Sequence, residues 1–360
     1  MADFLSETAT THFMAKRKLN KRQAWRIEKI QQEKAQRAER KETNISAQLS
    51  AGELGDETHG QVIAHFGTQV EVENSERTKF RCYLRANLGS LVTGDKVVFR
   101  PGPEVNVVGT GETVQTGVVE MVVERNSELS RPNPYNEVKP VAANIDFIVL
   151  VIAPEPEAHA NLIDRYLVAA ENCYIEPIIL LNKTDLINDS NQQRFDDLLA
   201  TYENLGYRTL RVCSKQEESL SEFKEFLNDR VSVFVGQSGV GKSSLIDTLL
   251  PEEELKVGAL SHASKKGRHT TTTARLYHFP AGGDLIDSPG IREFGLWHMN
   301  EDEVLHGFKE IRHLSGYCRF RDCHHEKEPG CAILEAVEKG EISEARFNSY
   351  KRILETLTEL

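Results

Sequence analysis

Long hydrophobic runs are absent from this sequence. The longest apolar stretch, residues 145–153, is interrupted by Asp146 and has the length of a buried strand. A membrane-spanning helix needs about 20 consecutive apolar residues. The N-terminal region is charged and lacks the short apolar core that marks a secretory signal. We therefore expect a soluble, cytoplasmic protein that makes no membrane contact.

Cysteine is also scarce. Six cysteines in 360 residues are too few for a disulfide scaffold. Three of them, Cys318, Cys323 and Cys331, lie close together near the end of the chain. Thiols with this spacing indicate a metal site in a reducing compartment.

Acidic residues outnumber basic ones overall, but basic residues are concentrated near the N-terminus. The formal net charge is −11, which ordinarily argues against a nucleic-acid partner. Residues 14–41 nevertheless contain eleven Lys or Arg against three Glu. We expect residues 1–55 to form a flexible basic arm, helical in part, that neutralises RNA phosphates. The alternative is a solvated charged tail without a partner, because charge runs are often only that.

Residues 56–125 are predicted to form a small β-barrel. Apolar and polar residues alternate in several short stretches that are separated by Gly and Pro. This pattern favours an OB-fold, a barrel that binds oligonucleotides, although an SH3-like barrel would give nearly the same pattern. The polar stretch 126–140 contains three prolines and is expected to be a linker. The predicted strands are 61–66, 69–72, 80–84, 96–99, 105–108 and 117–123.

Residues 141–298 are predicted to form an α/β domain, and residues 299–360 a small helical domain. In the first, apolar runs alternate with helical patterns, as in a parallel sheet that is covered on both faces. In the second, apolar residues recur at helical spacing. The predicted α/β strands are 145–152, 177–181, 209–212, 231–235, 275–279 and 284–286, and the predicted helices between them are 160–172, 194–205 and 219–227.

A phosphate-binding loop follows the strand at 231–235. The pattern G-x-x-x-x-G-K-[ST] turns backbone N–H groups around phosphate oxygens, and the next helix points its positive end at the same charge. We expect Lys242 to reach the β- and γ-phosphates as a catalytic residue, and Ser243 to bind Mg²⁺. The predicted nucleotide-binding residues of the loop are Gly236, Gln237, Ser238, Gly239, Val240, Gly241, Lys242, Ser243 and Ser244.

A base-reading motif follows the strand at 177–181, at the end of the strand where α/β sheets bind ligands. The pattern Asn-Lys-x-Asp reads guanine in GTPases. A carboxylate accepts hydrogen bonds from N1–H and the exocyclic amine of guanine, whereas adenine offers neither donor there. The motif residues are Asn182, Lys183, Thr184 and Asp185. A second guanine-contact loop, which resembles Ser-Ala-Lys, is predicted at Cys213, Ser214 and Lys215.

Two further segments are predicted to complete a magnesium site. The strand at 284–286 leads to Asp287 and Gly290, which fit the D-x-x-G element that holds Mg²⁺ through water and contacts the γ-phosphate. Between this element and the phosphate loop, Thr271 is the predicted second magnesium ligand, and Thr270 is the next choice. The threonine run could instead merely open the strand at 275–279.

Hydrolysis needs a group that orients the attacking water. Many GTPases carry Gln directly after D-x-x-G, but this chain has Ile291 there. We therefore hypothesise that His269 positions the water, with or without help from bound RNA. A histidine that contacts only RNA or solvent is the alternative.

The Cys/His cluster near the end of the chain has the composition of a zinc site. Cys318, Cys323 and Cys331 supply three thiolates, and His325 supplies an imidazole. Four such ligands leave no open position, so the predicted site is structural. His324 could replace His325, and buried free thiols are the remaining alternative.

The order of the motifs is unusual, because Asn182 precedes Gly236 by 54 residues. Ordinary GTPases have the phosphate loop first. Together with the predicted barrel and the Cys/His cluster, this order resembles the circularly permuted, small-ribosomal-subunit-dependent GTPases (the RsgA/YjeQ/EngC family) over residues 57–355. The resemblance implies one structural Zn²⁺ bound through His325 rather than His324, and Mg²⁺ bound with GTP.

The same resemblance implies a partner and a reaction. We expect a monomeric GTPase that binds the small ribosomal subunit and its rRNA, converts GTP to GDP and phosphate when the subunit stimulates it, and acts in late subunit maturation. Two alternatives remain: an ATP-using phosphotransferase with the same loop, and an RNA-binding module whose nucleotide is only structural. Asp185 argues against the first, and hydrolysis measured with and without small subunits separates the second.

Overall fold

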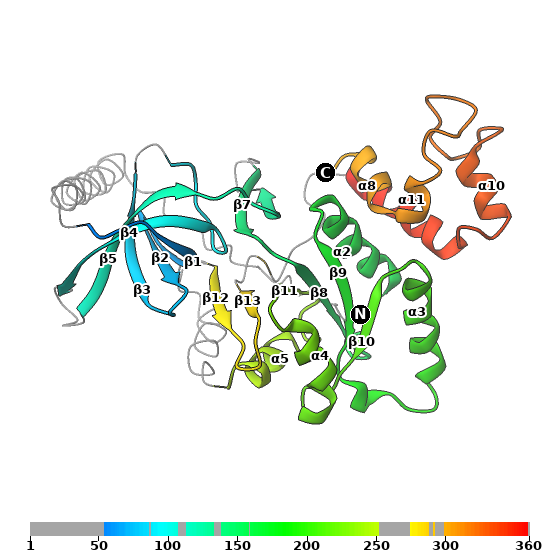
Figure 1. Ribbon diagram of the computed structural model, residues 1–360. Helices are drawn as coiled ribbons and strands as arrows, with labels where there is room; N and C mark the ends of the chain where they lie inside the picture. Colours follow the sequence, from blue (N-terminus) through cyan, green and yellow to red (C-terminus); the bar gives the residue numbers. More distant parts are fainter. Residues whose placement is uncertain are drawn as a thin grey trace, which may run out of the picture. The chain divides into compact units, whose positions relative to one another are not determined.

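In a computed structural model of the protein, the described residues are 54–85, 88–106, 113–132, 138–157, 159–251, 274–287, 291 and 299–358. The chain divides into two compact units, Met1–Leu54 and Gly55–Leu360, and the second holds all the described residues except Leu54 (Figure 1). All but the last two positions of the predicted basic arm, 1–55, lie outside the described residues. Among the helices that are described, none has the length and apolarity to cross a lipid bilayer.

The described part of residues 58–122 forms a closed barrel. Strand β1 pairs antiparallel with both β2 and β4, and β3 pairs in parallel with β5, so the sheet closes on itself. This closure is that of an OB-fold and excludes the SH3-like alternative. Buried side chains such as Val62, Val72 and Phe99 fill the interior. The strands are β1 (Thr58–Phe66), β2 (Gln69–Asn74), β3 (Lys79–Leu84), β4 (Lys96–Asn106) and β5 (Thr113–Val122).

Strand β4 includes the predicted strand 96–99 and the described part, 105–106, of the predicted strand 105–108, which were expected to be separate. Its pairing with β5 shifts register between Pro101 and Glu104. A bulge of this kind bends a strand and accommodates a proline, which has no N–H to donate to the ladder. The turn signal at Pro101 therefore marks a bend within one strand.

Residues 126–140 also differ from the expected linker. Strands β6 (Glu128–Pro132) and β7 (Val138–Ala143) pair with each other as a small antiparallel sheet. A register shift next to Pro140 accommodates the residue that lacks an N–H. Leu129 of β6 and Ala142 of β7 are fully buried, so this segment is a packed part of the fold.

The α/β part of the sheet has the strand order β10–β9–β8–β11–β13–β12. Neighbours pair in parallel except β12, which is antiparallel to β13. Strand β11, which precedes the phosphate loop, thus lies in the middle of the sheet although three of these strands precede it in the chain. The strands are β8 (Phe147–Ile152), β9 (Glu176–Leu181), β10 (Arg208–Arg211), β11 (Val231–Val235), β12 (Arg275–His278) and β13 (Asp284–Asp287).

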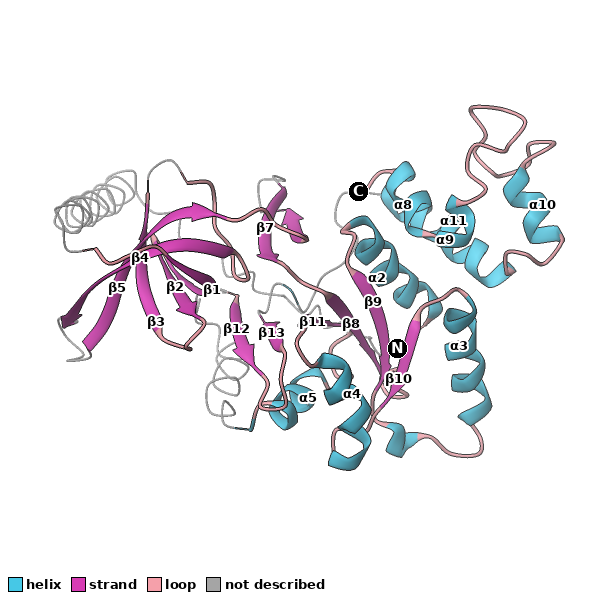
Figure 2. Cartoon of the chain, in the orientation of Figure 1, coloured by secondary structure: helices cyan, strands magenta, loops and turns pink. Residues whose placement is uncertain are grey.

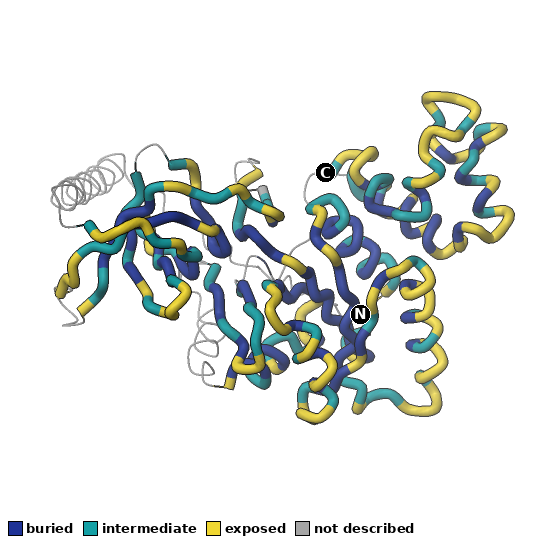
Figure 3. Tube along the Cα trace, in the orientation of Figure 1, coloured by how far each residue is buried: buried dark blue, intermediate teal, exposed yellow. Residues whose placement is uncertain are grey.

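Helices cover both faces of this sheet (Figure 2). Helices α2 (Ala160–Asn172) and α3 (Gln192–Asn204) share one apolar core with Ile148 and Leu150 of β8. Helices α4 (Ser221–Leu227) and α5 (Lys242–Leu249) share the other core with Val149 and Val151. Successive side chains of a strand point to opposite faces, so β8 must be apolar throughout, and Figure 3 shows it buried along its length.

The region 299–358 packs its helices against α2. Val168 of α2 lies in the same apolar core as Phe308 and Ile353. A capping box between Asn300 and Glu303 fixes the start of α8. The helices are α8 (Glu301–Gly307), α9 (Lys309–Arg312), α10 (Ala332–Glu338) and α11 (Glu344–Thr358).

A buried charge cluster fastens this region to α2. Arg346 of α11, which is 3% exposed, contacts Asp164 of α2 and lies 2.6 Å from the carboxylate of Glu310. The hydroxyl of Tyr202 donates a hydrogen bond to Asp164 at 2.7 Å. Burial raises the pKa of Asp164, and the charge of Arg346 opposes that shift. Without Arg346, the buried carboxyl group of Asp164 and the partly buried one of Glu310 would lose their counter-charge.

The barrel and the α/β sheet are joined through β12. Ala64 of β1 pairs with Arg275 of β12, which makes the two sheets continuous. Close by, His278 of β12 lies 2.7 Å from Glu73 of β2 and 2.6 Å from Asp284 of β13. Burial alone would lower the pKa of His278, but the two carboxylates raise it to about 9. The imidazolium is therefore charged at neutral pH and holds the junction.

We predict that Arg346→Ala lowers the free energy of unfolding of the 299–358 region by about 3–5 kcal/mol, the usual cost of removing one partner from a buried ion pair. Urea titration followed by hydrogen exchange of the α11 amides measures this change. Arg352, an exposed residue of the same helix, provides the control, and its replacement by Ala should change the free energy by less than about 0.5 kcal/mol. Equal effects of the two substitutions would contradict the prediction.

Candidate functional site

The predicted phosphate loop connects β11 to α5, and its shape depends on glycine. Gly236, Gly239 and Gly241 have φ angles of 135°, 88° and 97°, in the region that other residues rarely adopt. A Cβ atom on Gly236 would meet the carbonyl oxygen of Val151 at 2.3 Å, and one on Gly241 would meet the Asn182 amide nitrogen at 2.4 Å. The loop can therefore follow this path only with glycine at these positions.

Lys242 opens helix α5, and its ammonium group turns back over the loop. The Nζ atom lies 2.8 Å from the carbonyl oxygen of Gln237 and also contacts that of Gly236. Ser243, in the first turn of the helix, is half-buried, and Ser244 is exposed. A cation, a hydroxyl group and the positive end of a helix thus share one small region, as binding of phosphate with a magnesium ion requires.

Asn182 joins three loops. Its side chain is fully buried, and its amide group donates a hydrogen bond at 3.0 Å to the carbonyl oxygen of Val240 in the phosphate loop. Its amide oxygen accepts a hydrogen bond at 3.2 Å from the backbone N–H of Ser214. The end of β9 is thereby tied to the phosphate loop and to the 213–215 loop, so the two predicted motifs belong to a single site.

Lys183 adds a second link between the motifs. Its Nζ donates hydrogen bonds of 2.7 Å to the carbonyl oxygens of Gly239 and Glu155. A Cβ atom on Gly239 would lie 3.4 Å from Pro156. The loop after β8 therefore forms one wall of the site. This loop is not among the predicted site residues, although its position at the carboxyl end of a central strand indicates a ligand-binding loop.

Asp185 lies in a short 3₁₀ turn, Thr184–Leu186. One carboxylate oxygen lies 2.7 Å from the Lys215 ammonium group, and the other accepts a hydrogen bond from the Cys213 thiol at 3.3 Å. These two hydrogen bonds, that of Lys215 above all, lower the pKa of Asp185. The carboxylate is thus ionised at neutral pH and acts only as an acceptor, which suits the paired N–H donors of guanine.

Asp287 ends strand β13 at the same edge of the sheet. It is half-buried and pairs across the ladder with Arg275 of β12. Since β13 runs parallel to β11, its carboxyl end lies on the same side as the phosphate loop. The other predicted residues of this part of the site, His269, Thr270, Thr271 and Gly290, lie outside the described residues.

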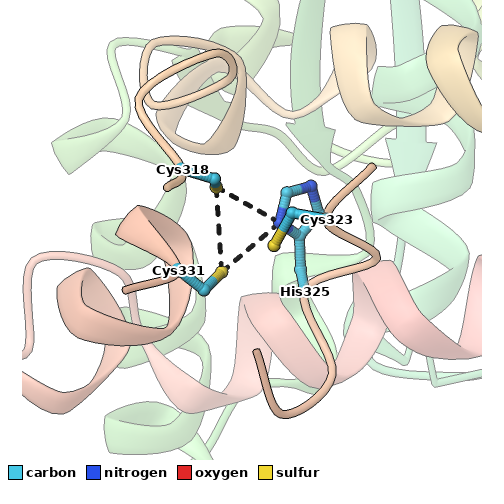
Figure 4. Close-up of side chains that lie close together, drawn as sticks. All are labelled: Cys318, Cys323, His325 and Cys331. Atoms are coloured by element: carbon cyan, nitrogen blue, oxygen red, sulfur yellow. Dashed lines mark hydrogen bonds between the residues drawn. The ribbon is translucent and has the colours of Figure 1, made fainter. Parts of the chain in front are cut away.

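A second cluster brings together the predicted metal ligands. The ligand atoms of Cys318, Cys323, His325 and Cys331 all lie within 4.8 Å of one another (Figure 4). The sulfur atoms of Cys318 and Cys331 are 3.9 Å apart, and Nδ1 of His325 lies 3.6 and 3.4 Å from them. A tetrahedral zinc ion with ordinary bond lengths needs edges of about 3.8 Å between sulfurs and about 3.5 Å between sulfur and nitrogen. The four side chains therefore fit such an ion.

His325, rather than His324, belongs to this cluster. His325 is 9% exposed and points its ring at the thiols. The backbone N–H of His324 instead donates a hydrogen bond to Glu328 at 2.9 Å. Several backbone N–H groups of this loop surround the Glu328 carboxylate and lower its pKa to about 2. An ionised Glu328 thus organises the loop that turns His325 inward.

Comparison with known proteins gives consistent matches. The family profile described as RsgA GTPase matches residues 122–297. A relative from Marinobacter nauticus, named small ribosomal subunit biogenesis GTPase RsgA, is 55% identical over 352 residues, which cover 96% of this chain and 97% of the relative. A relative of the same name from Pseudomonas aeruginosa is 55% identical over 346 residues, with 96% and 99% covered.

Two solved structures match as well. The crystal structure of YjeQ from Thermotoga maritima aligns with a TM-score of 0.65 and 31% identity over 84% of this chain and 99% of that one. The structure of YloQ, described as a circularly permuted GTPase, aligns with a TM-score of 0.65 and 29% identity over 84% and 96%. The rotated order of motifs, their meeting at one edge of the sheet and the nearly full-length relatives lead to one conclusion: this chain belongs to the RsgA GTPase family.

Proposed function

We propose that the protein binds GTP with Mg²⁺ at this edge of the sheet and hydrolyses it to GDP and phosphate during late maturation of the small ribosomal subunit. The observation that carries the proposal is the link from Asn182 to the phosphate loop, because it joins a base-reading motif to a phosphate-binding one. The names of the relatives support the subunit as the partner. The protein would act in the cytoplasm as a monomer, and would contact rRNA through the barrel, the basic arm and the 299–360 region.

Each motif has a part in this proposal. Asp185 accepts hydrogen bonds from the guanine edge, flanked by Lys183 and the 213–215 loop. Lys242 offsets the charge of the β- and γ-phosphates. The bound magnesium would neutralise the charge that develops on the phosphates. The residues that would hold it are Ser243, Thr271 and Asp287, and Gly290 would contact the γ-phosphate.

We propose His269 as the residue that orients the attacking water. A positioned general base or water-orienting group contributes about 10²–10⁴ in rate. Ile291, at the position where many GTPases carry Gln, has no polar group, and it is 2% exposed. Ile291 therefore cannot orient a water molecule, and His269 lies in the segment between the two phosphate motifs.

The helical region would hold one structural Zn²⁺. Three thiolates and one imidazole fill a tetrahedral shell and leave no position for water or substrate. The four ligands come from the stretch between α9 and α10, which contains no helix or strand and ends at Cys331, the N-cap of α10. The ion would therefore cross-link a segment that has no regular secondary structure of its own. Its contribution is to the folding of this region.

Base recognition is tested by Asp185→Asn, which replaces one acceptor oxygen with a donor amide. We expect the dissociation constant for GTP to rise about 10- to 100-fold, the effect of losing a hydrogen bond to a charged group. Xanthosine triphosphate should regain much of this loss, because it carries a carbonyl oxygen where guanine has its amine. Competitive titration with the two nucleotides and ATP measures this, with the exposed Asp189→Asn as control. Equal affinity of the unaltered protein for ATP and GTP would favour the phosphotransferase instead.

Catalysis is tested by single-turnover GTP hydrolysis with and without small ribosomal subunits. The unaltered protein should hydrolyse GTP faster with subunits, and His269→Ala should keep GTP affinity while losing at least about 100-fold in the stimulated rate. An unchanged stimulated rate in His269→Ala would reject the role of that residue. No hydrolysis by the unaltered protein in either condition would favour the RNA-binding module.

Metal content tests the zinc site. We expect one equivalent of zinc per chain by atomic absorption, and its loss in Cys331→Ser together with faster hydrogen exchange in α10 and α11. Binding of GTP should persist, because no residue of the nucleotide site belongs to this cluster. Cys173→Ser, which alters a cysteine outside the cluster, should retain the metal. Full zinc content in Cys331→Ser would contradict the assignment.

A further inference from the structure

A turn of the barrel, residues 92–95, packs against strands β7 and β13, which lie outside the barrel. Thr93 is fully buried, and its carbonyl oxygen accepts a hydrogen bond at 3.0 Å from the N–H of Ala143. A Cβ atom on Gly94 would lie 2.0 Å from the carbonyl oxygen of Ala143 and 3.0 Å from the side chain of Ile286. The turn is thus packed against β7 and β13 too closely for any side chain at position 94.

The hydroxyl group of Thr93 reaches the start of β12. It donates a hydrogen bond at 2.9 Å to the carbonyl oxygen of Ala274. The next residue, Arg275, pairs across the ladder with Asp287. Ile286, which the turn also contacts, directly precedes Asp287. The turn therefore contacts Ala274, which precedes the ladder partner of Asp287, and Ile286, which precedes Asp287 itself.

The turn has its own support on the barrel side. The carboxylate of Asp95, which is fully buried, accepts a hydrogen bond at 2.7 Å from the N–H of Val92. Arg125 donates to both oxygens of the same carboxylate, at 2.7 and 2.9 Å. Charge-assisted, bidentate hydrogen bonds of this kind fix the orientation of the carboxylate relative to the guanidinium group. The Thr93 hydroxyl is consequently presented to β12 from a rigid base.

We propose that Thr93 is a positioning residue for GTP hydrolysis: its hydroxyl fixes the start of β12 and, through the β12–β13 pair, holds Asp287 in place for the magnesium ion. The inference rests on the proposed function, in which Asp287 serves that ion. Thr93 itself touches neither nucleotide nor metal. The barrel, expected to contact RNA, would thus also set the geometry of the magnesium site.

Two substitutions at one position separate the hydroxyl group from the shape of the side chain. Thr93→Val keeps the branched shape and removes the donor, whereas Thr93→Ser keeps the donor. In Thr93→Val we expect the Mg²⁺ concentration for half-maximal GTP turnover to rise about fivefold, as loss of one hydrogen bond implies. Binding of GDP in EDTA should stay unchanged, and Thr93→Ser should behave as the unaltered protein.

Thr116→Val provides a matched control. The hydroxyl of Thr116, a residue that is 6% exposed, donates a hydrogen bond at 2.7 Å to the carbonyl oxygen of Pro103, so both partners lie within the barrel. This substitution should lower the melting temperature about as much as Thr93→Val while leaving the magnesium dependence unchanged. Equal magnesium dependence in Thr93→Val and Thr116→Val would overturn the proposal.

Hydrogen exchange separates this inference from the proposed function. In Thr93→Val the amides of Ile286 and Asp287 should exchange faster than in the unaltered protein, and in Thr116→Val they should not. This readout does not need turnover. Unchanged exchange at both amides would overturn the role of Thr93. Absence of magnesium-dependent turnover in the unaltered protein would instead overturn the GTPase proposal. In that case the exchange result alone would decide whether Thr93 supports Asp287.

Discussion

The hydrogen bonds of the Asn182 side chain hold together the loops of the proposed nucleotide site. One buried amide group joins the end of β9 to the carbonyl of Val240 in the phosphate loop and to the N–H of Ser214. A buried polar side chain with both ends satisfied fixes the loops that it connects, because breaking either bond leaves an unpaired group in the interior. The orientation of Asp185, three residues further on, depends on this anchor.

The barrel and the C-terminal helices are attached to the α/β domain by different interactions. The barrel is joined by strand pairing between β1 and β12 and by the hydroxyl group of Thr93. The C-terminal helices are joined to the α/β domain by the buried ion pair between Arg346 of α11 and Asp164 of α2. The first attachment lies beside the candidate site, because β12 pairs with β13 at Asp287. The second lies on α2, the helix that follows the loop that contacts Lys183.

Sequence patterns predicted the α/β elements well, because two-sided burial and helical periodicity leave strong signals. The helix predicted over 160–172 coincides with α2. The patterns failed where long-range pairing overrides local signals. The proline at position 101 indicated a turn but lies in a bulge of β4, and the polar stretch 126–140 pairs as β6 and β7. Local composition predicts neither β-bulges nor which strands pair with each other.

For the candidate site too, local patterns could be predicted from the sequence and long-range contacts could not. The phosphate loop and the base-reading motif are local patterns, so their residues could be named from spacing alone. Contacts between segments distant in the chain could not be predicted in this way. The hydrogen bonds from Lys183 to the carbonyl oxygen of Glu155, and from Thr93 to that of Ala274, depend on how the sheet is assembled. The choice between His324 and His325 needed a family resemblance, and the conformation of the loop then gave its physical reason.

A crystal structure with a non-hydrolysable GTP analogue and Mg²⁺ tests the central claim most directly, namely that motifs in rotated order build one nucleotide site. The account predicts the guanine edge within hydrogen-bonding distance of Asp185 and the phosphates enclosed by the loop at Lys242. A nucleotide whose base lies away from Asp185, or whose phosphates lie outside that loop, would contradict it.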